Sequence, residues 1–169
     1  MKLTIPPLLC LSVAVLSLPA ATLAEPSAVH VRTEQVNKLD TEKYTKTATR
    51  SLKIYVSNAS GESVDVKVKY HFFARDAAGK DIVVVDQGEK PIQVKPRATE
   101  MIETPAAKAT FIEAHAEKSK KIEASGIKFV GHAVQVLQSD KIVAEYYDPL
   151  SMKEQVGKAG PAPKPDAKK

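Results

Sequence analysis

The feature that most constrains the fold is an alternation of apolar and polar residues along residues 51–76, SLKIYVSNASGESVDVKVKYHFFARD. Successive side chains of a β-strand point to opposite faces, so a period of two predicts a strand with one buried face. The alternation pauses only at ASGE, residues 59–62, where Gly61 and polar residues favour a turn. Two alternating arms joined by a turn predict a β-hairpin. The expected inward set is Leu52, Ile54, Val56, Val64, Val66, Val68, Tyr70 and Phe72.

Further short strands are expected on both sides of this hairpin. DAAGKD, residues 76–81, predicts a second turn in which Gly79 supplies a positive φ. The uninterrupted run IVVVD is typical of a strand covered on both faces, and IQV between Pro91 and Pro96 is typical of an edge strand. The remaining strand signals lie in residues 28–36, with Val29, Val31 and Thr33 on one side, and in 126–149, a hairpin around QSDK in which Gly131 marks a bulge or close approach.

The sequence does not decide whether residues 106–125, AAKATFIEAHAEKSKKIEAS, form a helix or a strand. Their Ala, Glu and Lys content favours a helix. Phe111, Ile112 and Ile122 do not form a continuous helical stripe, however, and TFIEAHA alternates equally well as a strand. The strand is favoured slightly, because an antiparallel sheet needs a further partner there.

The first 24 residues predict a signal peptide for export. Lys2 precedes an apolar segment, and PAATLA supplies small residues before a cleavage site after Ala24. The alternative is an uncleaved membrane anchor, although three prolines interrupt the segment; after removal of the signal no membrane span is expected. Taking 24 residues from the 169 leaves 145 without cysteine, because Cys10 is the only one. Disulfides, cysteine zinc sites and thiol nucleophiles are thereby excluded from the processed chain.

The net charge of +5 is concentrated at the two ends of the chain. Residues 25–156 carry 20 basic and 19 acidic side chains, so this part is close to neutral. A nucleic-acid-binding protein needs a broad basic face, and nucleic acid is therefore not an expected partner. The Pro-, Ala- and Lys-rich end, residues 151–169, is predicted to be a disordered tail.

Seven or eight short strands separated by turns predict an all-β, antiparallel, immunoglobulin-like sandwich over residues 25–150. Residues 52–104 contain an apolar strand ending in VSNAS, a second ending in FARDAAGK, and then IQVKP. This pattern resembles the immunoglobulin-like or fibronectin-like sandwiches of exported bacterial proteins of unassigned role. The resemblance covers about a third of the chain and implies the fold class and no catalytic residue. Antibody domains pair two cysteines across a tryptophan, and this chain lacks both features after processing.

No recognisable catalytic or cofactor motif is found. The sequence has no Gly-x-Ser-x-Gly elbow, no phosphate-binding glycine loop and no His-Glu-x-x-His helix. Glu113 and Glu117 are more simply a solvated face than an acid–base pair, because Lys118, Lys120 and Lys121 accompany them. We therefore expect no catalytic residues and no cofactor.

Four histidines are far apart in the sequence: His30, His71, His115 and His132. Strands can bring distant residues together, so a periplasmic metal handler is one alternative function, with Met101 as a further soft ligand. We expect no metal ligand, because two neighbouring lysines repel a cation from His71, which is then a surface residue. A small hydrolase with an unrecognised site is the other alternative.

Tyr55 and Phe73 share the outward phase of the first hairpin, and Phe73 interrupts the polar pattern there. An exposed aromatic on an outer sheet face marks a candidate partner contact, whereas an ordinary structural role would place Phe73 under a loop or the N-terminal segment. The sequence thus predicts an exported, non-catalytic module, periplasmic or extracellular. Its partner is expected to be a protein or an envelope component, bound through a sheet face or a strand edge.

Overall fold

The computed structural model of the protein describes residues 28–77, 79, 81–117 and 120–162. The predicted signal peptide and its cleavage site lie outside these residues. The elements in chain order are β1 (Val29–Glu42), β2 (Thr45–Asn58), β3 (Val64–Asp76), β4 (Ile82–Val94), β5 (Thr99–Glu103), β6 (Ala107–Ile112), β7 (His115–Glu117), β8 (Lys120–Ile122), β9 (Ser125–Gln138), β10 (Lys141–Asp148), the 3₁₀ helix η1 (Leu150–Gln155) and β11 (Gly160–Pro161).

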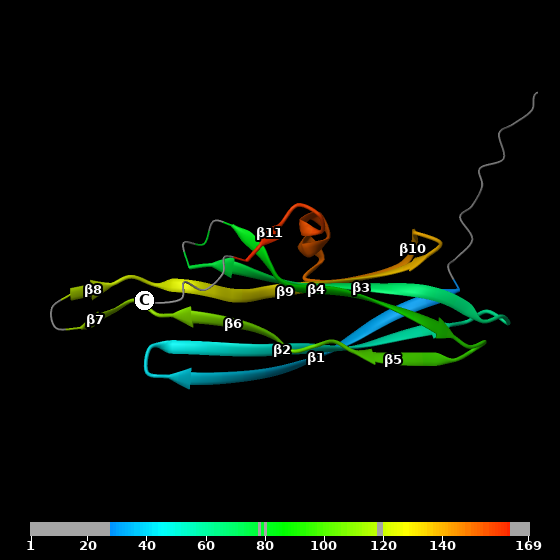
Figure 1. Cartoon of the computed structure of the whole chain (residues 1–169), viewed down its shortest axis with the longest axis horizontal. Coiled ribbons are helices and arrows are strands. Elements are labelled where there is room, and N and C mark those ends of the chain that lie inside the picture. The colour runs from blue at the N-terminus through cyan, green and yellow to red at the C-terminus, as the bar shows by residue number, and fades with distance from the viewer. Residues whose placement is uncertain (1–27, 78, 80, 118–119, 163–169) are drawn as a thin grey trace, which may run out of the picture.

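The long strands form two layers that face each other (Figure 1). In the first layer, sheet A, β2 pairs with β1 along one edge and with β5 and β6 in succession along the other. In the second layer, sheet B, β3 lies between β4 and β9, and β10 pairs with β9. The start of β9 also pairs with the end of β6, which joins the layers at one end. Strands hold 73% of the described residues, and the predicted all-β sandwich is confirmed, with shorter strands added to those expected.

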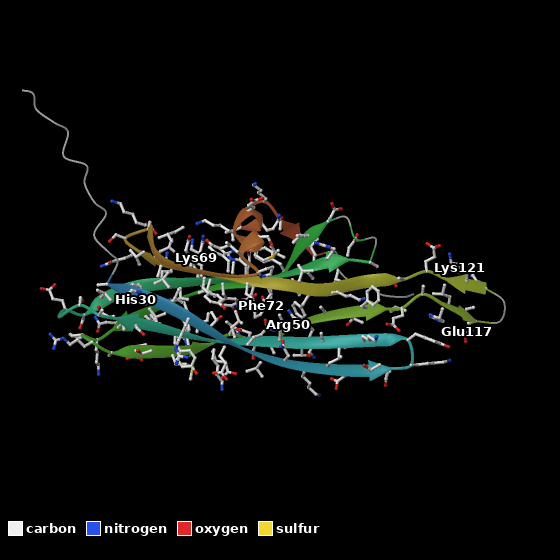
Figure 2. All side chains as sticks on the ribbon, turned by 180° about the vertical axis from the view of Figure 1, so that it is seen from behind. His30, Arg50, Lys69, Phe72, Glu117 and Lys121 are labelled. Carbon is white, nitrogen blue, oxygen red and sulfur yellow. The ribbon has the colours of Figure 1, made fainter. Side chains whose placement is uncertain are left out.

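The core is built by the predicted alternation. Of the eight residues expected to face inward, seven are buried, and Val64, partly buried, packs against them. Phe72 lies between the two layers, as Figure 2 shows. From sheet B, Val134 and Val136 of β9 complete the same interior. Each such side chain contributes roughly 1.5–3 kcal/mol when it leaves water, so the dry interior stabilises the fold without disulfides.

Both predicted turns of the first hairpins are confirmed. At ASGE, the buried Asn58 donates through Nδ2 to the Glu62 carbonyl at 2.7 Å and accepts through Oδ1 from the Ser60 amide at 2.9 Å. At DAAGKD, Asp76 accepts a hydrogen bond from the amide of Gly79, which has a φ of 75°. Asn58 and Asp76 stabilise the two turns by forming hydrogen bonds with backbone groups of the loops. Backbone polar groups without a partner are costly when they are buried.

The described residues between 106 and 125 contain strands at 107–112, 115–117 and 120–122, and the helical alternative is wrong for them. β6 pairs with β2, while β7 and β8 make a separate short hairpin. Within β6, Ala107 and Ala109 are buried and Lys108 between them is exposed. Small alanines fit here because β6 approaches both β2 and β9, and this tertiary pairing overrides the helical propensity of the segment.

Part of the segment predicted to be a disordered tail, residues 151–162, contains secondary structure. Residues 150–155 form η1, whose Met152 is buried. The chain then returns to the edge of sheet B, where β11 pairs in parallel with β4 and the Ala162 amide donates to the Val84 carbonyl at 2.8 Å. Met152, with Val156 and Ala159 packed against the same cluster, and a few backbone hydrogen bonds hold a segment whose composition alone indicates disorder. The rest of the predicted tail, residues 163–169, lies outside the described residues.

Candidate functional site

The two aromatics singled out in the sequence differ in exposure. Phe73 is 0% exposed, so the expectation that it is an exposed contact on an outer face is wrong. It packs against Ala133 and Met152 on the face of sheet B that η1 covers. The C-terminal helix thus supplies the cover, rather than the N-terminal segment considered from the sequence. Tyr55 remains partly exposed on the outer face of sheet A.

Tyr55 is positioned by its neighbours on both sides of β2. In the strand register, Arg32 of β1 and Met101 of β5 lie directly opposite it. The Arg32 guanidinium carbon lies 4.0 Å from the centre of the Tyr55 ring, a cation–π arrangement. The Tyr55 hydroxyl donates to Glu34 Oε2 at 3.1 Å. These two contacts orient the ring on the sheet surface.

Two further rows flank the Arg32–Tyr55–Met101 row on the same face. In one, the exposed Ser57 and Thr99 hydroxyls lie 2.8 Å apart, next to His30. In the other, Lys53 lies between Glu34 and Glu103 in the register. We call this surface the Tyr55 face: His30, Arg32, Glu34, Lys53, Tyr55, Ser57, Thr99, Met101 and Glu103. It is a mixed surface with Met101, 50% exposed, beside an oriented tyrosine and arginine.

The chemistry of the Tyr55 face suits contact with a macromolecule. Tyr, Arg and Met are enriched in protein interfaces relative to the rest of protein surfaces. An aromatic ring held in one orientation loses little conformational entropy on binding. The flanking charges of both signs provide the polar rim that such surfaces carry.

The described histidines do not converge. His30 is exposed near one end of the molecule, and Figure 2 shows it at the opposite end from Glu117 and Lys121 of the hairpin that carries His115. His132 faces the interior opposite Phe72, whereas His71 lies on the other face of sheet B, stacked beside Phe73. Within the described ranges, no group of three or more His, Cys, Asp or Glu residues is arranged to hold a metal ion.

His132 is buried, whereas His71 is partly buried beside Phe73. His132 is 1% exposed, its Nε2 lies 3.2 Å from the Thr33 hydroxyl, and its ring stacks on Tyr146. Burial lowers the pKa of His132, and burial together with the nearby Lys69 charge lowers the pKa of His71. Both shifts favour the neutral form of the ring in the folded protein.

One depression in the described surface carries exposed charged side chains. It has a volume of about 540 Å³, lies over β3 and β4 and includes Asp65, Lys67 and Asp140. Lys67 and Asp140 form a long ion pair of 3.9 Å, and both carboxylates are exposed. Acid–base catalysis relies on carboxyl groups tuned by burial or by close partners in a cleft, and the two carboxylates here are solvated.

Sequence reasoning identified Tyr55 but missed Arg32 and Glu34, and it considered Met101 solely as a metal ligand. The register of β1 and β5 against β2 brings these residues together, and that register is not encoded in a local pattern. One signal was available: Arg32 occupies the outward phase of a strand, as Tyr55 does.

Within the described residues, no helix has the length and apolar character needed to cross a membrane. No protein-family model matches the chain, and no curated protein matches it in sequence.

Several solved structures align with part of the chain at low identity. A β-glucuronidase of Bacteroides uniformis aligns with 71% of this chain at 11% identity and a TM-score of 0.46, and this chain spans 14% of that enzyme. A structural genomics target, SoR45, aligns with 72% of this chain and 86% of its own length at 10% identity and a TM-score of 0.39. A protein from Akkermansia muciniphila aligns with 76% of this chain and 75% of its own length, at 14% identity and a TM-score of 0.32.

Proposed function

We propose that the protein is an exported, non-catalytic β-sandwich module that binds another macromolecule, a protein or an envelope component, through the Tyr55 face. The observation that carries this proposal is the oriented Arg32–Tyr55 pair beside the exposed Met101 on a sheet surface. Such a preformed surface lowers the entropic cost of binding, because its central side chain is already ordered. Export, to the periplasm or the cell exterior, is supported by the signal-like residues 1–24.

The binding proposal is tested by photo-cross-linking in the native cells, with a photoreactive amino acid placed at position 55. The matched control position is 110, because Thr110 is exposed on β6 of the same sheet. We expect a discrete cross-linked partner from position 55 and none from position 110. Exchanging Met101 for Asp should weaken the cross-link while the fold is retained, since Met101 is half exposed. The absence of any product from position 55, or identical products from both positions, would contradict the proposal.

Export is tested separately by sequencing the N-terminus of the protein purified from those cells. A sequence beginning at Glu25 supports removal of residues 1–24, whereas a sequence beginning at Met1 contradicts it.

A further inference from the structure

β1 forms the edge of sheet A. Among the described residues it pairs with β2 alone, in a continuous register from Val29 opposite Asn58 to Glu42 opposite Thr45. The strand contains no proline, and its register shows no bulge. Natural proteins commonly use those two devices to prevent a further strand from adding to an edge. β1 is therefore long and regular enough to accept one.

Every second residue of β1 directs its backbone amide and carbonyl to the unpaired side of the strand. The Ala28 carbonyl accepts a hydrogen bond from the Ala59 amide, which places the polar groups of Ala28 on the side of β2. In an antiparallel ladder the amide and carbonyl of successive residues point to opposite sides, so the even-numbered residues bond to β2. The odd-numbered residues then direct these groups away from β2. They include Val31, Thr33, Gln35, Asn37, Leu39 and Thr41.

The side chains on the outer face of β1 carry charges in an order that places opposite charges together when two copies of the strand pair antiparallel. All seven are exposed, and they are, in order, His30, Arg32, Glu34, Val36, Lys38, Asp40 and Glu42. If a second copy of β1 pairs antiparallel about Val36, Glu34 faces the partner's Lys38 and Arg32 faces the partner's Asp40. His30 then faces the partner's Glu42, and Val36 faces the partner's Val36. Opposite charges at directly paired positions stabilise a ladder, and like charges destabilise it.

Other registers lack this complementarity. Moving the two-fold axis from Val36 to Gln35 sets Arg32 against the partner's Lys38, and moving it to Asn37 sets Glu34 against the partner's Asp40. Placing the axis on Glu34 or on Lys38 pairs that residue with its own copy. Each alternative thus opposes like charges, whereas the Val36 register opposes none. The Val36 register also spans the strand from His30 to Glu42, nearly its full length.

We propose that the protein forms a symmetric dimer with a second copy of itself, in which two β1 strands pair antiparallel about Val36 and join two copies of sheet A. On each copy, six odd-numbered residues direct their backbone amides and carbonyls away from β2, and together they would form about twelve hydrogen bonds between the two strands. The dimer also covers Val36 and Leu39, apolar side chains that are 43% and 64% exposed in the single chain. Closure by a two-fold axis stops the addition of further strands at this edge. The dimer is a separate proposal from the partner of the Tyr55 face, and the two surfaces share Arg32 and Glu34.

A charge exchange between positions 34 and 38 tests the register. Glu34→Lys sets a lysine against the partner's Lys38, and Lys38→Glu sets a glutamate against the partner's Glu34. Each single variant should raise the dimer dissociation constant at least tenfold by sedimentation equilibrium of the purified protein. The double variant, with both exchanges, restores opposite charges and should return the constant to within about threefold of the original.

Glu89→Lys and Lys108→Glu are matched controls, because both residues are exposed on strands away from β1 and lie outside the Tyr55 face. They should leave the dissociation constant unchanged. Asn37→Pro removes an amide directed away from β2 and should abolish the dimer, while circular dichroism shows a folded β protein. The proposal is overturned if the chain is monomeric at its solubility limit. It is equally overturned by a dimer that withstands Asn37→Pro, or by a double variant that is as weak as the single variants.

Discussion

Phe73 and Tyr55 occupy the same outward phase of one hairpin, yet they have different roles in the fold. Replacing Phe73 with Ala leaves a cavity against Ala133 and Met152, and we expect the free energy of unfolding to fall by about 3–5 kcal/mol. Tyr55→Ala removes a partly exposed ring and its cation–π contact, so a loss of about 1 kcal/mol or less is expected.

Urea denaturation of both variants measures this difference. A Phe73→Ala protein as stable as the unchanged protein would place Phe73 outside the core. If Tyr55→Ala instead caused the larger loss, Tyr55 would be structural and unsuited to bind a partner.

The buried His132 and the partly buried His71 predict a pH dependence of stability. Their pKa values are lowered in the folded protein, so between about pH 6.5 and the lower folded values the unfolded chain binds more protons. Stability is therefore fully present above pH 6.5 and falls as the pH decreases through this window, by at most about 1.4 kcal/mol per pH unit for each histidine.

Urea midpoints measured from pH 7.5 to 5.5 test this dependence. The exchanges His71→Gln and His132→Asn should each flatten the decline, since each removes one titrating ring. Stability that is constant, or that rises towards pH 5.5, is inconsistent with neutral buried rings.

At the residue scale, the inward set of the first hairpin could be predicted because a period of two follows directly from strand geometry. The burial of Phe73 could not, since its cover is Met152, which is remote in sequence and lies in a segment that resembles a tail. Gly131 was expected at a bulge or close approach. That prediction is confirmed by a register shift beside it and by the Asp148 carbonyl, which lies 2.3 Å from where a side-chain carbon would be.

Truncation of the chain tests directly whether η1 and β11 stabilise sheet B. A chain ending at Pro149 lacks η1 and β11, so Phe73 and Ala133 lose the cover of Met152. We expect a loss of about 2–5 kcal/mol, comparable to removal of a buried methionine, together with binding of a dye that reports exposed apolar surface.

A chain ending at Ala162 is the matched control, because it retains both elements and lacks residues 163–169 alone. It should unfold at the same urea concentration as the full chain. Equal stability of the two truncated chains would show that η1 does not stabilise sheet B.

At the element scale, sequence patterns located strands more reliably than their ends. β1 was expected over residues 28–36 but extends to Glu42. The prediction stopped short because the last residues of the strand are exposed and show no alternation of apolar and polar side chains. Likewise, helical propensity in residues 106–125 conflicted with the pairing that β2 and β9 impose on β6. In both cases long-range pairing determined the element, and a local pattern contains little of that information.

At the scale of the whole molecule, two layers enclose an apolar interior, and surfaces for contact remain on the outer face and edge of sheet A. The Tyr55 face and the β1 edge share Arg32 and Glu34, whose side chains point outward from the edge strand. The fold class followed from the sequence. The Tyr55 face depended on strand register, and only its central residue could be identified beforehand.

The central claim is that one phase of β2 faces a dry interior and the other presents the binding face. Thiol labelling tests both halves in a Cys10→Ser background, with single cysteines placed in turn at positions 52–57. We expect slow labelling at 52, 54 and 56 and fast labelling at 53, 55 and 57, with protection of the fast set when the cross-linked partner is added. Uniform labelling along the strand would contradict the sandwich, and fast labelling at 55 that the partner leaves unchanged would contradict the binding face.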